Sequence, residues 1–160
     1  MIFFIIIQLI LVAIGATSAM TWFSYAMSKS FRELYKEPVL LSYALKKTNI
    51  SLSEKSQKTW GWLIHYIIGF LFVMGYYIVW VKNMLSVSPL NALLLGVISG
   101  VIGILSWIVI FKMTDHQPPI DFKGYYIQLF FAHIIFAVTA TALYSITLTL
   151  LILLKAYVTV

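Results

Sequence analysis

Two histidines lie inside apolar stretches of the sequence, where an imidazole is costly unless it has a partner or a task. His65 and His133 are each followed by a small residue four positions later and by a tyrosine, Tyr76 or Tyr144, eleven positions later. On a helix of 3.6 residues per turn, steps of four and eleven return to within about 40° of the starting direction. Each histidine therefore shares a helix face with its tyrosine, and an ionisable group in such a place predicts a functional site.

Further titratable side chains are expected at the same end of the molecule. The connection before the last apolar stretch carries Asp115, His116 and Asp121. At 1.5 Å per residue, the depths of His65 and His133 in their helices differ by about 6 Å, so the two rings could meet beneath this connection. We expect all of these residues to form one polar cluster, with Asp121 capping the last helix.

Three interpretations of this cluster are open. In the first, His65 and His133 hydrogen-bond Tyr, Ser or Thr on neighbouring helices and hold the bundle together. In the second, the two imidazoles are paired ligands of haem or a divalent metal, although no close spacing such as His-x-x-x-His occurs. In the third, the cluster is a polar pocket for a lipid headgroup, a quinone or a small solute.

Hydroxyl and glycine residues at helical spacing mark faces where helices pack closely. A hydroxyl stripe follows one face of the first apolar stretch, and a Gly-x-x-x-Gly pattern with a further glycine lies on the third. The packing residues are Thr17, Thr21 and Ser24 in the first set and Gly96, Gly100 and Gly103 in the second. These patterns predict close contact, either within the bundle or between subunits.

Several kinds of chemistry lack their motifs in this chain. There is no Gly-rich phosphate loop, no Ser-His-Asp arrangement and no carboxylate inside an apolar stretch. The absence of cysteine excludes disulfides and thiolate metal sites. We expect no catalytic residues, which favours a protein that is not an enzyme and weighs against a transporter.

The elements that must position these residues are four membrane-spanning helices. The chain is 62% hydrophobic and only 10% charged over 160 residues, too apolar for a soluble core. Four apolar runs are long enough to cross a bilayer core of about 30 Å. They cover 2–27, 60–81, 91–111 and 125–154, and all four prolines fall between them. The sequence predicts an all-α, polytopic, single-domain protein over residues 1–160.

The basic residues predict the orientation in the membrane. Nine of the eleven Lys and Arg residues lie in 28–59 and 112–124, and Lys82 and Lys155 lie on the other side. Positive charge is retained in the cytoplasm, so both termini are expected on the non-cytoplasmic side. Within the cytoplasmic connection 28–59, the stretch 38–47 predicts a short interfacial helix. The net charge of +6 therefore suits anionic membrane lipids better than nucleic acid.

The spacing also indicates an internal repeat. Gly15 and Trp22 align with Gly100 and Trp107, as His65 and Tyr76 align with His133 and Tyr144. The four helices would then form two similar hairpins, a parallel 2+2 repeat about an axis along the membrane normal.

Three segments carry a resemblance to a known group of proteins. They are 15–21, the Gly61-Trp62-x-x-His65-x-x-x-Gly69 element and the Leu129-x-x-x-His133 element. In these the chain resembles small bacterial four-helix inner-membrane proteins classified only as domains of unknown function. The resemblance implies a bacterial inner membrane and no particular activity. Our leading hypothesis is a non-catalytic bundle that acts in binding or assembly, as a homo-oligomer or within a larger membrane complex, with a cytoplasmic site around His65 and His133.

Overall fold

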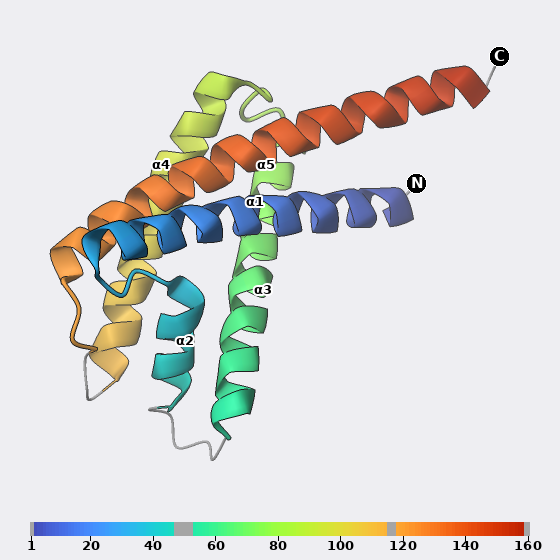
Figure 1. The fold of residues 1–160 in the computed structure, drawn as a ribbon. Coiled ribbons are helices and arrows are strands. Elements are labelled where there is room, and N and C mark those ends of the chain that lie inside the picture. Colours follow the sequence, from blue (N-terminus) through green and yellow to red (C-terminus); the bar gives the residue numbers. More distant parts are fainter. Residues whose placement is uncertain (1, 47–52, 115–117, 159–160) are drawn as a thin grey trace.

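The part of the chain that the structure describes forms five helices, as expected for an all-α protein (Figure 1). The computed structural model describes residues 2–46, 53–114 and 118–158, and these residues contain no strand. The helices are α1 (Ile2–Phe31), α2 (Glu37–Lys46), α3 (Glu54–Val81), α4 (Pro89–Met113) and α5 (Phe122–Val158). The predicted fold class is confirmed.

Four of the helices are long and apolar enough to cross a membrane, which makes this a multi-pass membrane protein. The spans are Phe3–Phe31, Glu54–Val81, Pro89–Met113 and Phe122–Leu154. Each is longer than the apolar run predicted for it, because the helix continues into neighbouring polar residues, and α3 and α4 begin at capping serines. Ser53 accepts a hydrogen bond from the Ser56 amide before α3, and Ser88 caps α4 in the same way ahead of Pro89.

The short helix α2 occupies the stretch predicted to be interfacial. Glu37 and Pro38 lie in its first turn and Lys46 in its last, which suits both the helix dipole and the missing amide hydrogen of proline. Its start packs against α3 at Gly61, where a Cβ would lie 2.5 Å from the carbonyl oxygen of Pro38. A side chain at Gly61 would therefore push α2 away.

Helices α1 and α5 lie side by side, and α3 and α4 both cross this pair (Figure 1). Helices α1 and α5 run antiparallel, so that the start of α1 and the end of α5 lie on the same side. Helix α4 packs along α5, and α3 packs on α1. Helices α3 and α4 contact each other less, and Tyr76 of α3 donates to the Ser99 hydroxyl of α4 at 2.8 Å, toward the end far from α2. Helices α3 and α4 are therefore least closely packed against each other at the end of the bundle that carries α2.

The glycines of α4 pack inside the bundle, against α5. A Cβ on Gly96 would lie 2.7 Å from Cα of Ile134, and one on Gly100 would lie 2.9 Å from the ring of Phe130. A Cβ on Gly103 would lie 2.5 Å from the imidazole of His133. All three glycines predicted to lie on a packed helix face therefore approach α5 of the same chain.

The residues paired by the proposed repeat lie in different surroundings. Trp22 is 75% exposed, whereas Trp107 is buried against Phe111 and Tyr125. Trp80 is also buried within the chain, where its ring lies 4.5 Å from that of Tyr144. The repeat stays a prediction from sequence spacing.

The contact between Gly96 and the backbone of α5 gives a stability prediction. We expect Gly96→Ala to lower the free energy of unfolding in detergent micelles by about 1–3 kcal/mol, because a backbone atom cannot move aside for a Cβ. The matched control is Gly75→Ala, where a Cβ meets nothing within 4 Å. It should stabilise α3 by up to about 1 kcal/mol. Equal effects of the two changes would contradict this packing.

Candidate functional site

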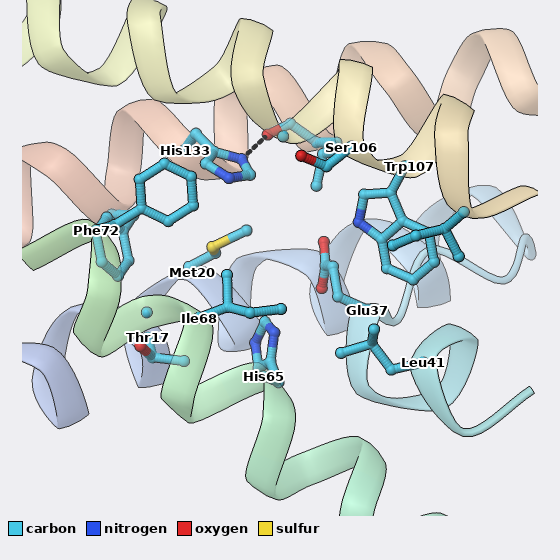
Figure 2. A pocket seen from close by; sticks show the side chains of 15 residues that line it. Thr17, Met20, Glu37, Leu41, His65, Ile68, Phe72, Ser106, Trp107 and His133 are labelled. Atoms are coloured by element: carbon cyan, nitrogen blue, oxygen red, sulfur yellow. Dashed lines mark hydrogen bonds between the residues drawn. The ribbon is translucent and has the colours of Figure 1, made fainter. Parts of the chain in front are cut away.

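A cavity of about 180 Å³ lies where all five helices meet, at the α2 end of the bundle (Figure 2). Both histidines of the apolar spans line it, His65 from α3 and His133 from α5, together with Thr17 and Met20 of α1. Helix α2 contributes Glu37 and Leu41, and α4 contributes Gly103, Ser106 and Trp107. The sequence analysis expected His65 and His133 in one polar cluster, and the structure places both of them in the wall of this cavity.

The hydrogen bond of His65 determines which ring nitrogen carries the proton. Its Nε2 lies 2.9 Å from Oγ1 of Thr21, and that hydroxyl donates its only hydrogen to the carbonyl oxygen of Thr17 at 2.7 Å. Thr21 must therefore accept from Nε2–H, which leaves Nδ1 of a neutral His65 as an acceptor. Among the described residues, no partner meets that nitrogen.

In His133 the nitrogen that is free to accept a hydrogen bond is Nε2, whereas in His65 it is Nδ1. Nδ1 of His133 lies 2.9 Å from the carbonyl oxygen of Leu129, which can only accept, so Nδ1 carries the proton and Nε2 is the free acceptor. Figure 2 shows Nε2 on the ring edge turned toward the cavity. The ring fits here because Gly103 has no side chain, and Phe72 packs on it edge-to-face at 5.5 Å.

A carboxylate that the sequence analysis placed outside the bundle lies in this cavity. The side chain of Glu37 is 2% exposed, and Figure 2 shows it pointing into the cavity. Its Oε1 accepts from Ser24 at 2.7 Å and, more weakly, from Gln128 at 3.4 Å. Its Oε2 is buried without a hydrogen-bond partner in the described part of the chain. Burial raises the pKa of Glu37 to about 7, against the opposing effect of the Ser24 and Gln128 hydrogen bonds.

The cavity reaches the surface between α3 and α4. Ile68 of α3 and Ser106 of α4 line it and are also exposed. Ser106 donates to the carbonyl oxygen of Ile102 at 2.8 Å, so its remaining capacity is to accept. In Figure 2 the indole nitrogen of Trp107 lies on the side of the ring that faces Glu37. A ligand of small cross-section can therefore enter from the lateral face of the bundle.

Other residues predicted for the site lie elsewhere. Tyr76 and Tyr144 do not line the cavity; they pack with Trp80 toward the opposite end of the bundle. Asp121 is exposed and caps α5, with its Oδ1 accepting from the amide of Lys123 at 3.1 Å, as expected for a cap. Asp115 and His116 fall outside the described residues.

The hydroxyl stripe of α1 follows the wall of the cavity. Thr17 faces Gly69 of α3, Thr21 binds His65, and Ser24 binds Glu37. All three hydroxyl residues thus lie at contacts between α1 and another helix, and their packing role stays a prediction. The hydroxyl oxygen of Thr17 is buried and has no hydrogen-bond partner among the described residues.

The structure also bears on the metal and haem interpretation. Within the described ranges, no three His, Asp or Glu side chains come close enough to hold a metal ion. A volume of about 180 Å³ lies below the roughly 300–1,000 Å³ typical of cofactor sites, so haem does not fit without a large rearrangement. His65 and His133 converge on a space suited to a smaller ligand.

Sequence reasoning missed Glu37. It found no carboxylate inside an apolar stretch, and Glu37 does lie outside the four spans, but α2 carries this carboxylate into the bundle, where it is buried. Glu37 lies outside every apolar run, so hydropathy alone places it in water. The available signal was indirect: Ser24 and Gln128 are polar residues inside or beside predicted spans, and both need acceptors there. Trp107, which the sequence pattern singled out only as part of the internal repeat, also lines the cavity.

The raised pKa of Glu37 predicts how stability changes with pH. The unfolded carboxyl ionises near 4.5 and the folded one near 7, so between these values unfolding releases a proton. Stability should therefore fall as pH rises from about 4.5 to 7, by about 3 kcal/mol from this group. The measurement compares the free energy of unfolding of the wild type and of Glu37→Gln in detergent, each at pH 5 and at pH 8. Titrating groups that both proteins share contribute equally, so the difference between the two proteins is the contribution of Glu37.

The control for this measurement is Glu33→Gln, a partly exposed carboxyl four residues earlier. It should keep the loss of stability seen in the wild type, whereas Glu37→Gln should abolish most of it. The same loss in all three proteins would show that Glu37 is not the titrating group.

Comparison with known proteins gives no relative: no protein-family model, curated protein or solved structure matches the chain. The function must therefore be argued from the cavity itself.

Proposed function

We propose that this is a non-catalytic membrane protein that binds a small polar ligand in the cavity between His65, His133 and Glu37. The observation that carries the proposal is the convergence of these three buried side chains, from three different helices, on one open space. Polar groups buried among apolar helices are expensive, and three that share a cavity favour a binding site over separate packing contacts.

The hydrogen bonding of His65 supports a binding role over a catalytic one. A histidine that activates a hydroxyl nucleophile accepts the hydroxyl proton. Here the Thr21 hydroxyl donates its hydrogen bond to the carbonyl oxygen of Thr17 and accepts one from His65. The hydrogen bond between Thr21 and His65 therefore runs in the opposite direction to the one that activation requires. The pair holds the ring of His65 in place.

Charge supports placing the cavity on the cytoplasmic side of the membrane. The cavity lies at the end of the bundle that carries α2, and the connections at this end hold nine of the eleven Lys and Arg residues. Positive residues flank the cytoplasmic ends of membrane helices, so both termini would lie outside. The sequence resemblance to bacterial inner-membrane proteins suggests that membrane as the location.

Accessibility of the cavity to a small molecule tests the proposed function. The chain has no cysteine, so Met20→Cys supplies a single thiol in the cavity wall. We expect methyl methanethiosulfonate to label it much faster than Leu9→Cys in the same helix. Both native residues are 6% exposed, and only Met20 lines the cavity. Equal labelling in lipid nanodiscs would show that the cavity is closed and would refute the proposed function.

The orientation is testable separately. Alkaline phosphatase fused after Val160 should be active, since that enzyme folds only outside the cytoplasm, and a fluorescent protein that folds only in the cytoplasm should be dark at the same position. The reverse result would place the cavity on the outer side.

A further inference from the structure

The free polar atoms in the cavity wall are mostly hydrogen-bond acceptors. Nδ1 of His65, Nε2 of His133 and Oε2 of Glu37 each have a lone pair without a partner in the described part of the chain. The hydroxyl of Ser106 has already given its proton to the carbonyl of Ile102. The donors in the wall are the indole N–H of Trp107 and the hydroxyl of Thr17, which has no partner in the described part of the chain and can either donate or accept. Such a cavity selects a ligand that donates several hydrogen bonds.

The charge of the wall also favours a cation. Among the described residues that line the cavity there is no Lys or Arg, and Glu37 is the single carboxylate. A carboxylate removed from water gains most from a positively charged partner that also donates hydrogen bonds. An anionic or purely accepting ligand would find neither a counter-charge nor enough donors.

The spacing of the acceptors argues for a polyatomic cation instead of a metal ion. No three acidic or imidazole side chains approach closely enough to share an ion, among the residues that are described. The space of about 180 Å³ also exceeds the need of a bare ion. A primary ammonium has three hydrogens and meets its acceptors at about 2.8 Å, farther than the roughly 2.0–2.2 Å of a zinc ligand, so it tolerates a wider spacing of acceptors on separate helices.

We propose that the cavity binds a primary ammonium group, R–NH₃⁺, with Glu37 as counter-ion and His65 and His133 as hydrogen-bond acceptors. This proposal rests on the proposed function, because it names the ligand class of the same cavity. The ammonium group can belong to a free amine or to an ethanolamine lipid headgroup. The opening between α3 and α4, at Ile68 and Ser106, admits either source.

Protection of the Met20→Cys thiol tests the ligand class. In nanodiscs of phosphatidylcholine, methylammonium should slow labelling by methyl methanethiosulfonate in a saturable manner. Tetramethylammonium carries the same charge but has no N–H donor, so it should give little protection. Equal protection by the two cations, or none by methylammonium, would overturn the proposal. If the thiol is labelled quickly but never protected, the cavity is open and holds only water; the proposed ligand class then fails while access is intact.

The role of Glu37 is tested in the same labelling assay. Glu37→Gln should raise the methylammonium concentration that gives half-protection by roughly ten- to one-hundredfold, because it removes a charge-assisted hydrogen bond. Glu33→Gln makes the same chemical change outside the cavity and should leave this concentration unchanged. If Glu37→Gln does not fold, the comparison of the two cations in the protein with Glu37 intact still decides the question.

The two sources of the ammonium group are separated by the lipid. If the natural ligand is a lipid headgroup, nanodiscs that contain phosphatidylethanolamine should protect the Met20→Cys thiol without added amine, and those of phosphatidylcholine should not. If the ligand is a free amine, the two lipids should give equal labelling rates, and methylammonium should protect in both. Protection by phosphatidylcholine alone would contradict the proposal, since its headgroup has no N–H donor.

Discussion

The buried hydrogen bonds of Glu37 join three helices, and the candidate site depends on them. Ser24 of α1 donates to the carboxylate of α2, and Gln128 of α5 donates to Ser24 at 2.6 Å. Taking a carboxylate out of water costs several kcal/mol, which these donors offset only in part. Helix α2 is too short and too polar to span a membrane, so this contact and its packing on Gly61 hold it against the bundle. Without α2, one wall of the cavity would be missing.

The cavity exists because the helix pairs pack unequally. The glycines of α4 allow a close approach to α5, and Gly103 in particular leaves room for the imidazole of His133. Helix α3 packs on α1 through Gly69, which receives Thr17. Because α4 packs on α5 and α3 packs on α1, α3 and α4 make little contact with each other at the α2 end. The cavity lies in the space between them. Small residues thus determine the position of the cavity as much as its polar residues do.

Most of the fold follows from sequence patterns that act locally. Apolar length, proline positions and capping serines locate the spans and α2, and the glycine spacing locates a packed face, because each reflects neighbours along the chain. The burial of Glu37 could not be read in this way, since its donors come from helices distant in sequence. The shared spacing of His65 with Tyr76, and of His133 with Tyr144, places each pair on one face but about 16 Å apart along the helix axis, too far to share one site. The histidines reach the cavity, and the tyrosines pack nearer the opposite end.

The charge of a buried carboxylate with one free oxygen can be removed by a proton or compensated by a cation, and the two compete. A proton on Oε2 of Glu37 makes the group neutral and turns an acceptor into a donor, which no longer suits an ammonium ligand. A bound cation leaves the carboxylate ionised and compensates its charge. Proton and cation therefore exclude each other at this oxygen, and with a pKa of about 7 the free carboxyl is close to balance near neutral pH. The burial that makes Glu37 costly to the fold is thus also what makes it responsive to a ligand.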